Sequence, residues 1–284
     1  MFLGYNTNGF AHHRLEDAIE IIGELGYRGV GLTLDVHHLN PFDTALESRR
    51  VETWNQLQQR GLACVVETGS RFLLDPRRKH QPTLISPEPL TRGARGEFLE
   101  RCVSLALALN TPGNAVVSFW SGTAVDDAPP AEHMDRLVDG CRRLSDFAAY
   151  MNVRLAFEPE PGMFIDTMDR FAELHARVNH PAFGLTIDVG HLVCNGELPV
   201  SRVLAEWKHV LWNVHIEDMR RGVHDHLMFG EGEVDFADVF AGLRAAGYDA
   251  GVYVELSRHS HDAVNTARKA KAFLDTFMGG EPGA

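Results

Sequence analysis

The sequence predicts a (β/α)8 barrel, an α/β fold in which eight parallel strands alternate with helices and close on themselves. Short apolar runs alternate with longer amphipathic segments along the chain, which is the pattern of βαβ units. A length of 284 residues suits one such barrel. Four of the apolar runs end in a carboxylate or carry an imidazole, as expected where strand ends build an active site. We therefore expect a single domain over residues 1–284.

Eight apolar runs account for the predicted strands. They cover residues 2–5, 29–34, 63–67, 115–119, 153–158, 184–188, 211–216 and 251–255. Apolar residues at helical spacing predict helices near residues 15–25, 44–60, 98–109, 131–151 and 262–277. Gly26 and Gly61 stand where the first two helices should stop. An open doubly wound sheet is the alternative, but no Gly-x-Gly-x-x-Gly motif follows the first run.

A long polar segment at residues 71–96 follows the third predicted strand. It contains several prolines and a basic cluster at residues 77–80. Its position after a strand places it on the face of the barrel where the strands end. Long loops in compact domains are often functional, so the segment is either a lid or substrate loop, or a solvated insertion.

Charge and composition narrow the class of protein. The formal net charge is −12, from 27 basic and 39 acidic residues, so we expect no nucleic-acid partner, because non-specific binding to nucleic acid needs a basic surface. Four cysteines show no disulfide spacing. The sequence shows neither a signal peptide nor a membrane-spanning run, which predicts a cytoplasmic protein without membrane contact. Self-association into a homo-oligomer is left open.

Four strand ends carry the residues on which the functional prediction rests. Glu158, Asp188, His215 and Glu255 stand at or near the ends of the last four predicted strands. Three carboxylates and one imidazole suit one divalent metal ion of borderline hardness. Glu158 and Glu255 could also divide proton abstraction and return between them. One such carboxylate alone would favour a helix cap or an ion pair, but four strands together favour a site.

The residues that follow these ligands extend the predicted site. In Asp188-Val-Gly-His191, Gly190 would permit a tight turn that brings His191 to the same cavity. Asp188 could instead cap the next helix. Farther along, we expect Glu217 and Asp218 to be loop residues or to lie behind the metal ligands.

Other residues on this face could contact a substrate. Arg221 could clamp an anionic or hydroxyl-rich substrate, or form a solvated basic pair with its neighbour. The Trp120 indole could stack on a sugar-like ligand or serve packing, and Glu67 ends the third strand on the same face.

The motif His224-x-His226 has two interpretations. His226 could contact the substrate, or the two histidines could bind a second metal ion. The chain has 15 histidines, so some of them are expected to be incidental. The sequence therefore leaves open whether a second metal ion binds near His191, His224 and His226.

With these residues the chain resembles the xylose isomerase-like TIM-barrel superfamily. The nearest likeness is to its sugar isomerase/epimerase branch (tagatose epimerase-like, hydroxypyruvate isomerase-like and inosose dehydratase-like enzymes), and a more distant one is to endonuclease IV-like proteins. The segments that carry the resemblance are Phe157-Glu-Pro159, Asp188-Val-Gly-His191, His215-Ile-Glu-Asp218, Gly230-Glu-Gly-Glu-Val-Asp235 and Glu255. The resemblance covers nearly the whole chain.

The resemblance implies roles for particular residues. Glu158, Asp188, His215 and Glu255 would bind one divalent metal ion, for which manganese is expected and cobalt, zinc or magnesium are alternatives. Glu158 and Glu255 would also exchange protons with a substrate carbon. His191 and Arg221 would hold substrate hydroxyls.

The resemblance also implies a reaction. It is a metal-dependent isomerisation or epimerisation of a ketose, inosose or related polyol, by proton transfer next to a carbonyl through an enediolate. A lyase or dehydratase, including one that acts on a 3-keto-glycoside, would use the same base and metal. An endonuclease IV-like phosphodiesterase needs histidines after strands three and four, where this chain has Glu67-Thr-Gly and Trp120-Ser-Gly. A non-catalytic sugar-binding barrel is disfavoured, because buried carboxylates are costly to keep without a use.

Overall fold

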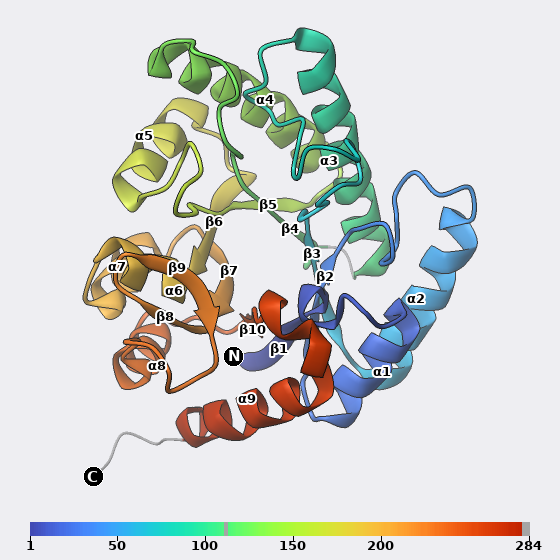
Figure 1. The fold of residues 1–284 in the computed structure, drawn as a ribbon, viewed down its shortest axis with the longest axis vertical. Helices are drawn as coiled ribbons and strands as arrows, with labels where there is room; N and C mark the ends of the chain where they lie inside the picture. Colours follow the sequence, from blue (N-terminus) through green and yellow to red (C-terminus); the bar gives the residue numbers. More distant parts are fainter. Residues whose placement is uncertain (111–112, 280–284) are drawn as a thin grey trace.

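The predicted strands are present and close into the expected barrel. The computed structural model describes residues 1–110 and 113–279. Within them, eight parallel strands close in the order β1-β10-β7-β6-β5-β4-β3-β2, and the helices lie outside the sheet (Figure 1). The barrel strands are β1 (Phe2–Asn6), β2 (Gly29–Thr33), β3 (Ala63–Glu67), β4 (Val116–Phe119), β5 (Arg154–Phe157), β6 (Phe183–Asp188), β7 (Leu211–Ile216) and β10 (Gly251–Val254).

Helices make every connection between barrel strands. The elements of the outer layer are η1 (Thr7–Phe10), α1 (Leu15–Glu24), α2 (Leu46–Arg60), α3 (Pro89–Leu109), α4 (Pro130–Tyr150), α5 (Met168–Val178), α6 (Val189–Asn195), α7 (Val200–Trp207), α8 (Phe236–Ala245), η2 (Ser257–Asp262) and α9 (Ala263–Met278). The stop signals act as predicted, since α1 and α2 are followed by Gly26 and Gly61 at φ values of 84° and 62°. None of the described helices is long and apolar enough to cross a membrane.

The prediction for residues 71–96 is wrong in its second half. Helix α3 already begins at Pro89, at a position where proline loses no helical hydrogen bond. Residues 81–86 are buried, which excludes a solvated insertion for that stretch. Arg95 is only 1% exposed, with its guanidinium carbon 5.0 Å from the ring centroids of both Phe98 and Trp120. The polar composition misled the prediction because this arginine is buried against aromatic rings.

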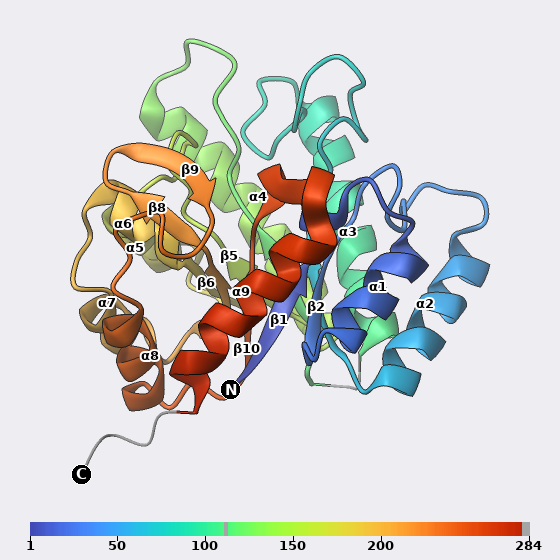
Figure 2. The same cartoon turned by 60° about the horizontal axis from the view of Figure 1, so that its bottom comes forward.

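A small hairpin was not predicted from the sequence. Strands β8 (Asp218–Arg220) and β9 (Val223–Leu227) pair antiparallel after β7. They lie at the same end of the barrel as the loops before α3 and α4, opposite the N-terminus (Figure 2). The buried Asp218 carboxylate fixes the chain beyond the hairpin, because it accepts backbone N–H groups from Met219, Gly230, Gly232 and Val234 at 2.8–3.1 Å. Asp218 is therefore an organiser of the loop.

An aromatic cluster packs one side of the barrel against its helices. Phe119, Phe157 and Phe183 come from β4, β5 and β6, and Phe171 comes from α5. All four are buried, and the centroid distances from Phe157 to Phe119 and Phe183 are 5.2 and 5.8 Å. Rings at this spacing contribute more than their buried area alone. Strand β5, which directly precedes Glu158, thus packs against aromatic rings from both neighbouring strands and from α5.

Replacing Phe183 with alanine should destabilise the protein strongly. We expect the free energy of unfolding to fall by about 3–5 kcal/mol, because the change leaves a cavity among buried rings. Tyr150, which is 86% exposed, supplies the matched control, and Tyr150→Ala should change the free energy of unfolding by at most about 0.5 kcal/mol. Denaturant titration followed by tryptophan fluorescence measures both, and equal losses in the two variants would contradict this account of the core.

Candidate functional site

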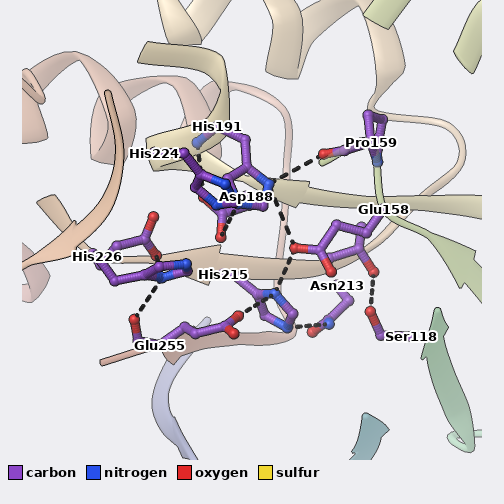
Figure 3. A network of polar contacts seen from close by, with 12 residues as sticks. Ser118, Glu158, Pro159, Asp188, His191, Asn213, His215, His224, His226 and Glu255 are labelled. Carbon is purple, nitrogen blue, oxygen red and sulfur yellow. Dashed lines mark hydrogen bonds and ion pairs between the residues drawn. The ribbon is translucent and has the colours of Figure 1, made fainter. Parts of the chain in front are cut away.

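The barrel brings together the four residues that were predicted as metal ligands. Glu158, Asp188, His215 and Glu255 each offer one ligand atom, and these atoms all lie within 4.8 Å of one another. Asp188 and His215 are paired neighbours on β6 and β7, and the two glutamates directly follow β5 and β10. Figure 3 shows the four side chains converging from these strand ends. Parallel strands end at one face of the barrel, which is why residues far apart in sequence meet there.

His215 is the centre of this group. Its Nδ1 lies 3.0 Å from Glu158 Oε1 and 3.0 Å from Glu255 Oε2. On the opposite side of the ring, its Nε2 lies 2.9 Å from Glu67 Oε1. A carboxylate behind an imidazole fixes the orientation of the ring and makes the other nitrogen more basic. One nitrogen therefore faces the cluster, and the other is held by Glu67.

The charges of these groups are strongly linked. Burial raises the pKa of Glu158 to about 8, against the opposing charge of His215. Burial would also raise the pKa of Glu255, but the charge of His215 and its hydrogen bond leave that pKa below its usual value. Burial lowers the pKa of His215, but the nearby carboxylates Glu67, Glu158 and Glu255 outweigh it and hold the pKa well above its usual value. Glu158 therefore binds a proton more strongly than Glu255 does.

Asp188 caps the next helix, which is one of the two roles that the sequence left open for it. Its Oδ1 accepts the backbone N–H of His191 at 2.9 Å and so caps α6. Its Oδ2 is buried and meets no N–H or hydroxyl donor in the described part of the chain. The carboxylate therefore orients the helix with one oxygen and keeps the other for the cluster.

Gly190 has a different role from the predicted one. It lies inside α6 and does not form a tight turn. A Cβ at this position would lie 2.0 Å from Glu217 Oε1, so glycine is required because the Glu217 carboxyl packs against the helix. Burial and the neighbouring Asp188 hold the pKa of Glu217 well above its usual value. The protonated Glu217 can then share a hydrogen bond with Asp188, which explains two adjacent buried carboxyl groups.

Three histidines form a second group beside the first. His191 Nε2 lies 3.0 Å from His224 Nε2, and His226 Nδ1 lies 3.1 Å from the backbone oxygen of Glu255. One ring nitrogen of each histidine lies within 4.8 Å of the others. Burial lowers the pKa of His191 to about 4 and also lowers that of His224. These two rings are therefore neutral near pH 7 and able to accept through a nitrogen lone pair.

Both groups open into one cavity of about 190 Å³. Its lining contains the predicted residues Glu158, Glu255, His191, His226 and Trp120. Two larger hollows, of about 680 and 660 Å³, lie elsewhere on the surface and contain none of the strand-end carboxylates. The smaller cavity is therefore the candidate site, since among these three it alone is lined by the strand-end carboxylates Glu158 and Glu255.

Two predicted substrate contacts lie outside this cavity lining. Arg221 is at the exposed turn of the β8–β9 hairpin, and its guanidinium packs over Gly196, where a Cβ would lie 2.9 Å from Nη2. The turn directs this side chain toward the end of α6. Glu67 is buried under His215 and also accepts a hydrogen bond from Asn213 Nδ2 at 3.1 Å. Its position behind the imidazole removes it from contact with a molecule in the cavity.

Asn8 and Glu160 belong to the site but were not predicted from the sequence. Asn8 Nδ2 donates to Glu255 Oε1 at 2.8 Å, and Asn6, which was expected to help close the pocket wall, has its Nδ2 3.4 Å from Glu255 Oε2. Glu160 lines the cavity, and burial, together with Glu158, holds its pKa well above the usual value. Asn6 ends β1 and Asn8 lies in η1 directly after it, and this position at a strand end was the available signal for Asn8. Glu160 follows Pro159, so its direction depends on a turn that no sequence pattern indicated.

The first group fits a divalent metal ion. Three carboxylates and one imidazole form a mixed oxygen and nitrogen donor set. Asp188 Oδ2 accepts no hydrogen bond from an N–H or hydroxyl donor in the described structure, and a cation there would offset its charge, as the Glu217 proton otherwise would. Glu67 supplies the carboxylate behind the imidazole that metal-binding histidines commonly have.

The chain is similar in sequence to a dehydratase and to an epimerase. The chain is 25% identical over 203 residues to inosose dehydratase of Lacticaseibacillus casei, covering 64% of this chain and 68% of the relative. It is 26% identical over 228 residues to the L-ribulose-5-phosphate 3-epimerase UlaE of Salmonella paratyphi C (strain RKS4594), covering 79% of each.

Solved structures agree in fold. A D-tagatose 3-epimerase-like protein superposes with a TM-score of 0.81 at 18% identity, covering 98% of this chain and 97% of that one. The zinc-bound IOLI protein gives a TM-score of 0.75 at 16% identity and full coverage of both chains, 100% each. Residues 19–277 match the family described as xylose isomerase-like TIM barrel. The barrel, its strand-end carboxylates and this match together place the chain in the xylose isomerase-like TIM-barrel family.

Proposed function

We propose that this protein is a metal-dependent isomerase or epimerase that acts on a ketose, an inosose or a related polyol. The observation that carries the proposal is the contact of Glu158 and Glu255 with the same nitrogen of His215, each at 3.0 Å, in the wall of the cavity. Two carboxyl groups that flank one cavity and differ in their pKa are suited to acid–base exchange. A volume of about 190 Å³ suits a molecule of monosaccharide size.

The two glutamates would divide the proton transfer. Glu255 is held in its ionised form by His215 and by the amide of Asn8, so it is the better base for a proton next to a carbonyl. Glu158, whose pKa is raised to about 8, is the better donor for the return of a proton to the opposite face or the neighbouring carbon. For the reverse epimerisation the two glutamates would exchange the roles of acid and base.

A divalent cation at Glu158, Asp188, His215 and Glu255 would supply Lewis acidity for a carbonyl or hydroxyl oxygen. Manganese remains our expectation, with cobalt, zinc or magnesium as alternatives. The bound zinc of the IOLI protein supports a metal in this family. Glu67 would keep the His215 ring in the orientation that turns Nδ1 to the cation, and Trp120 would form an apolar wall for the sugar carbons.

A dehydratase is the second candidate, favoured by the likeness to inosose dehydratases. The same base would remove the proton, and a leaving group on the next carbon would depart. The two reactions differ in products, because isomerisation keeps the mass of the substrate and dehydration loses water.

Glutamine at position 158 or 255 should reduce proton exchange by about 10²–10⁴-fold, because glutamine cannot move a proton. Exchange is measured as deuterium uptake next to the carbonyl when manganese-loaded protein is incubated with ketoses and inososes in D2O. The same spectra separate epimer from dehydration product. Glu206→Gln, a change at an exposed glutamate of α7, should leave exchange unaltered. Full exchange in both site variants would refute the proposed roles.

Replacing Glu67 with glutamine should weaken manganese binding by about 10–100-fold, because the His215 ring loses the carboxylate that orients it. Isothermal titration calorimetry of the metal alone measures the change. Glu67→Asp should recover part of the affinity, whereas Glu206→Gln should match the unmodified protein. An unchanged affinity in Glu67→Gln would show that the carboxylate does not support the ligand.

Manganese affinity should rise with pH between about 6 and 8. In the metal-free protein the pKa of Glu158 is about 8, and that of His215 is well above its usual value. A cation binds the deprotonated groups, so each proton that must leave weakens binding by up to about tenfold for each pH unit below its pKa. Titrations at several pH values test this, and an affinity that falls or stays constant as pH rises would contradict it.

A further inference from the structure

We propose that Arg95 is a positioning residue, which holds the indole of Trp120 and the chain after β3 in place as one wall of the substrate cavity. This inference rests on the proposed function, because it concerns how the substrate is bound. Trp120, Gly69 and His80 line the cavity, whereas Arg95 is absent from its lining. Arg95 would therefore act on a bound molecule only through these three residues.

This wall lies across the barrel from the proposed acid–base groups. In the closed order of the eight strands, β3 stands four places from β7, and β4 stands four places from β10. Trp120 directly follows β4, and Glu255 directly follows β10. A substrate that reaches Glu255 in this cavity therefore has Trp120 on its opposite side. The place of the indole limits where the reacting carbon of the substrate can lie.

Arg95 holds the wall from behind. Its guanidinium carbon lies 5.0 Å from the ring centroids of both Trp120 and Phe98, so the cation is packed against two aromatic rings. Its Nη1 donates to Ser70 Oγ at 2.9 Å, and its Nη2 donates to the backbone oxygen of Thr68 at 3.4 Å. One side chain of α3 thus joins the chain after β3 to the residue after β4.

His80 contacts the same indole. Its ring meets that of Trp120 edge to face, with the centroids 5.0 Å apart and the planes at 86°. The ring of His80 is itself fixed, because its Nδ1 donates to the backbone oxygen of Gly69 at 2.7 Å. Trp120 is therefore held by Arg95 and by His80, and loss of the guanidinium would free the indole to turn on one side.

An arginine is a costly choice for this position. Arg95 is only 1% exposed, and no carboxylate among residues 1–110 and 113–279 forms an ion pair with it. Burial lowers the pKa of the guanidinium to about 10, so the group keeps its charge at pH 7. Methionine would fill similar space without the cost of burying a charge. Only the arginine, however, donates to Ser70 and attracts the face of the Trp120 indole.

Kinetics of Arg95→Met test this role, with the ketose or inosose that exchanges deuterium in the manganese-loaded protein. We expect KM to rise by about tenfold and kcat to change by less than about threefold, because a displaced wall weakens binding equally in the ground state and the transition state. Arg95→Lys keeps a cation and should recover part of the affinity. Arg101→Met is the matched control, since Arg101 is an exposed residue of the same helix that lies 4.8 Å from the ring of Phe42 and outside the cavity lining. It should leave both constants unchanged.

A second measurement needs no turnover and no ligand. Protein labelled with 5-fluorotryptophan gives fluorine signals from its four tryptophans, and the signal of Trp120 is the one that Trp120→Phe removes. We expect this signal to broaden or split in Arg95→Met, because the indole takes more than one orientation, and to stay single in Arg101→Met. Ser70→Ala removes only one contact of the guanidinium and should broaden the signal less. This milder variant decides the question if Arg95→Met fails to fold.

The outcomes separate this inference from the proposed function. A single sharp Trp120 signal in both Arg95→Met and Ser70→Ala would overturn the role of Arg95. A loss of kcat at constant KM in Arg95→Met would overturn it as well, because the wall would then not bind the substrate. If no ketose or inosose exchanges deuterium with the unmodified protein, the proposed function fails, whereas the fluorine signals still decide whether Arg95 positions Trp120.

Discussion

The burial of His215 among three carboxylates is the constraint on which the rest of the site depends. Its Nδ1 contacts Glu158 and Glu255, and its Nε2 contacts Glu67. Burial of any one of these groups alone would be costly, and the positive charge of His215 offsets part of the negative charge of the carboxylates. Because the four residues come from four strands, this compensation holds only when the barrel is closed. The fold and the chemistry are therefore linked through one imidazole.

The surroundings of this centre keep it fixed from several directions. Asp188 caps α6 with one oxygen while it faces the cluster with the other. Asp218 holds the loop beyond the β8–β9 hairpin through backbone N–H groups, which positions the strand that bears His224 and His226. These buried carboxylates thus use their hydrogen bonds to hold α6 and the loop after β9 in place. The proposed transfer of a proton between these carboxyl groups and a substrate carbon would need this rigidity.

Membership in the family determines the fold but not the reaction. Relatives of this chain include a 3-epimerase and a dehydratase, and both reactions can begin with a proton removed next to a carbonyl. In the proposed mechanism one pair of glutamates would serve both reactions, and only the later fate of the enediolate would differ. The three histidines beside the carboxylate cluster also line the cavity.

The sequence by itself determined the barrel and the four residues at its strand ends. Apolar runs that end in Glu158, Asp188 and Glu255 were sufficient to predict that these residues lie together, because parallel strands end on one face of a barrel wherever they lie in the chain. Residue orientation was decided only by the tertiary structure. Glu67 lies behind His215 and Arg221 turns toward Gly196, although both sit on the predicted face. Direction depends on which neighbour a side chain packs against, and contacts such as that of Asn8 with Glu255 join residues 247 positions apart. No local pattern encodes a contact of that separation, so only the closed barrel could reveal it.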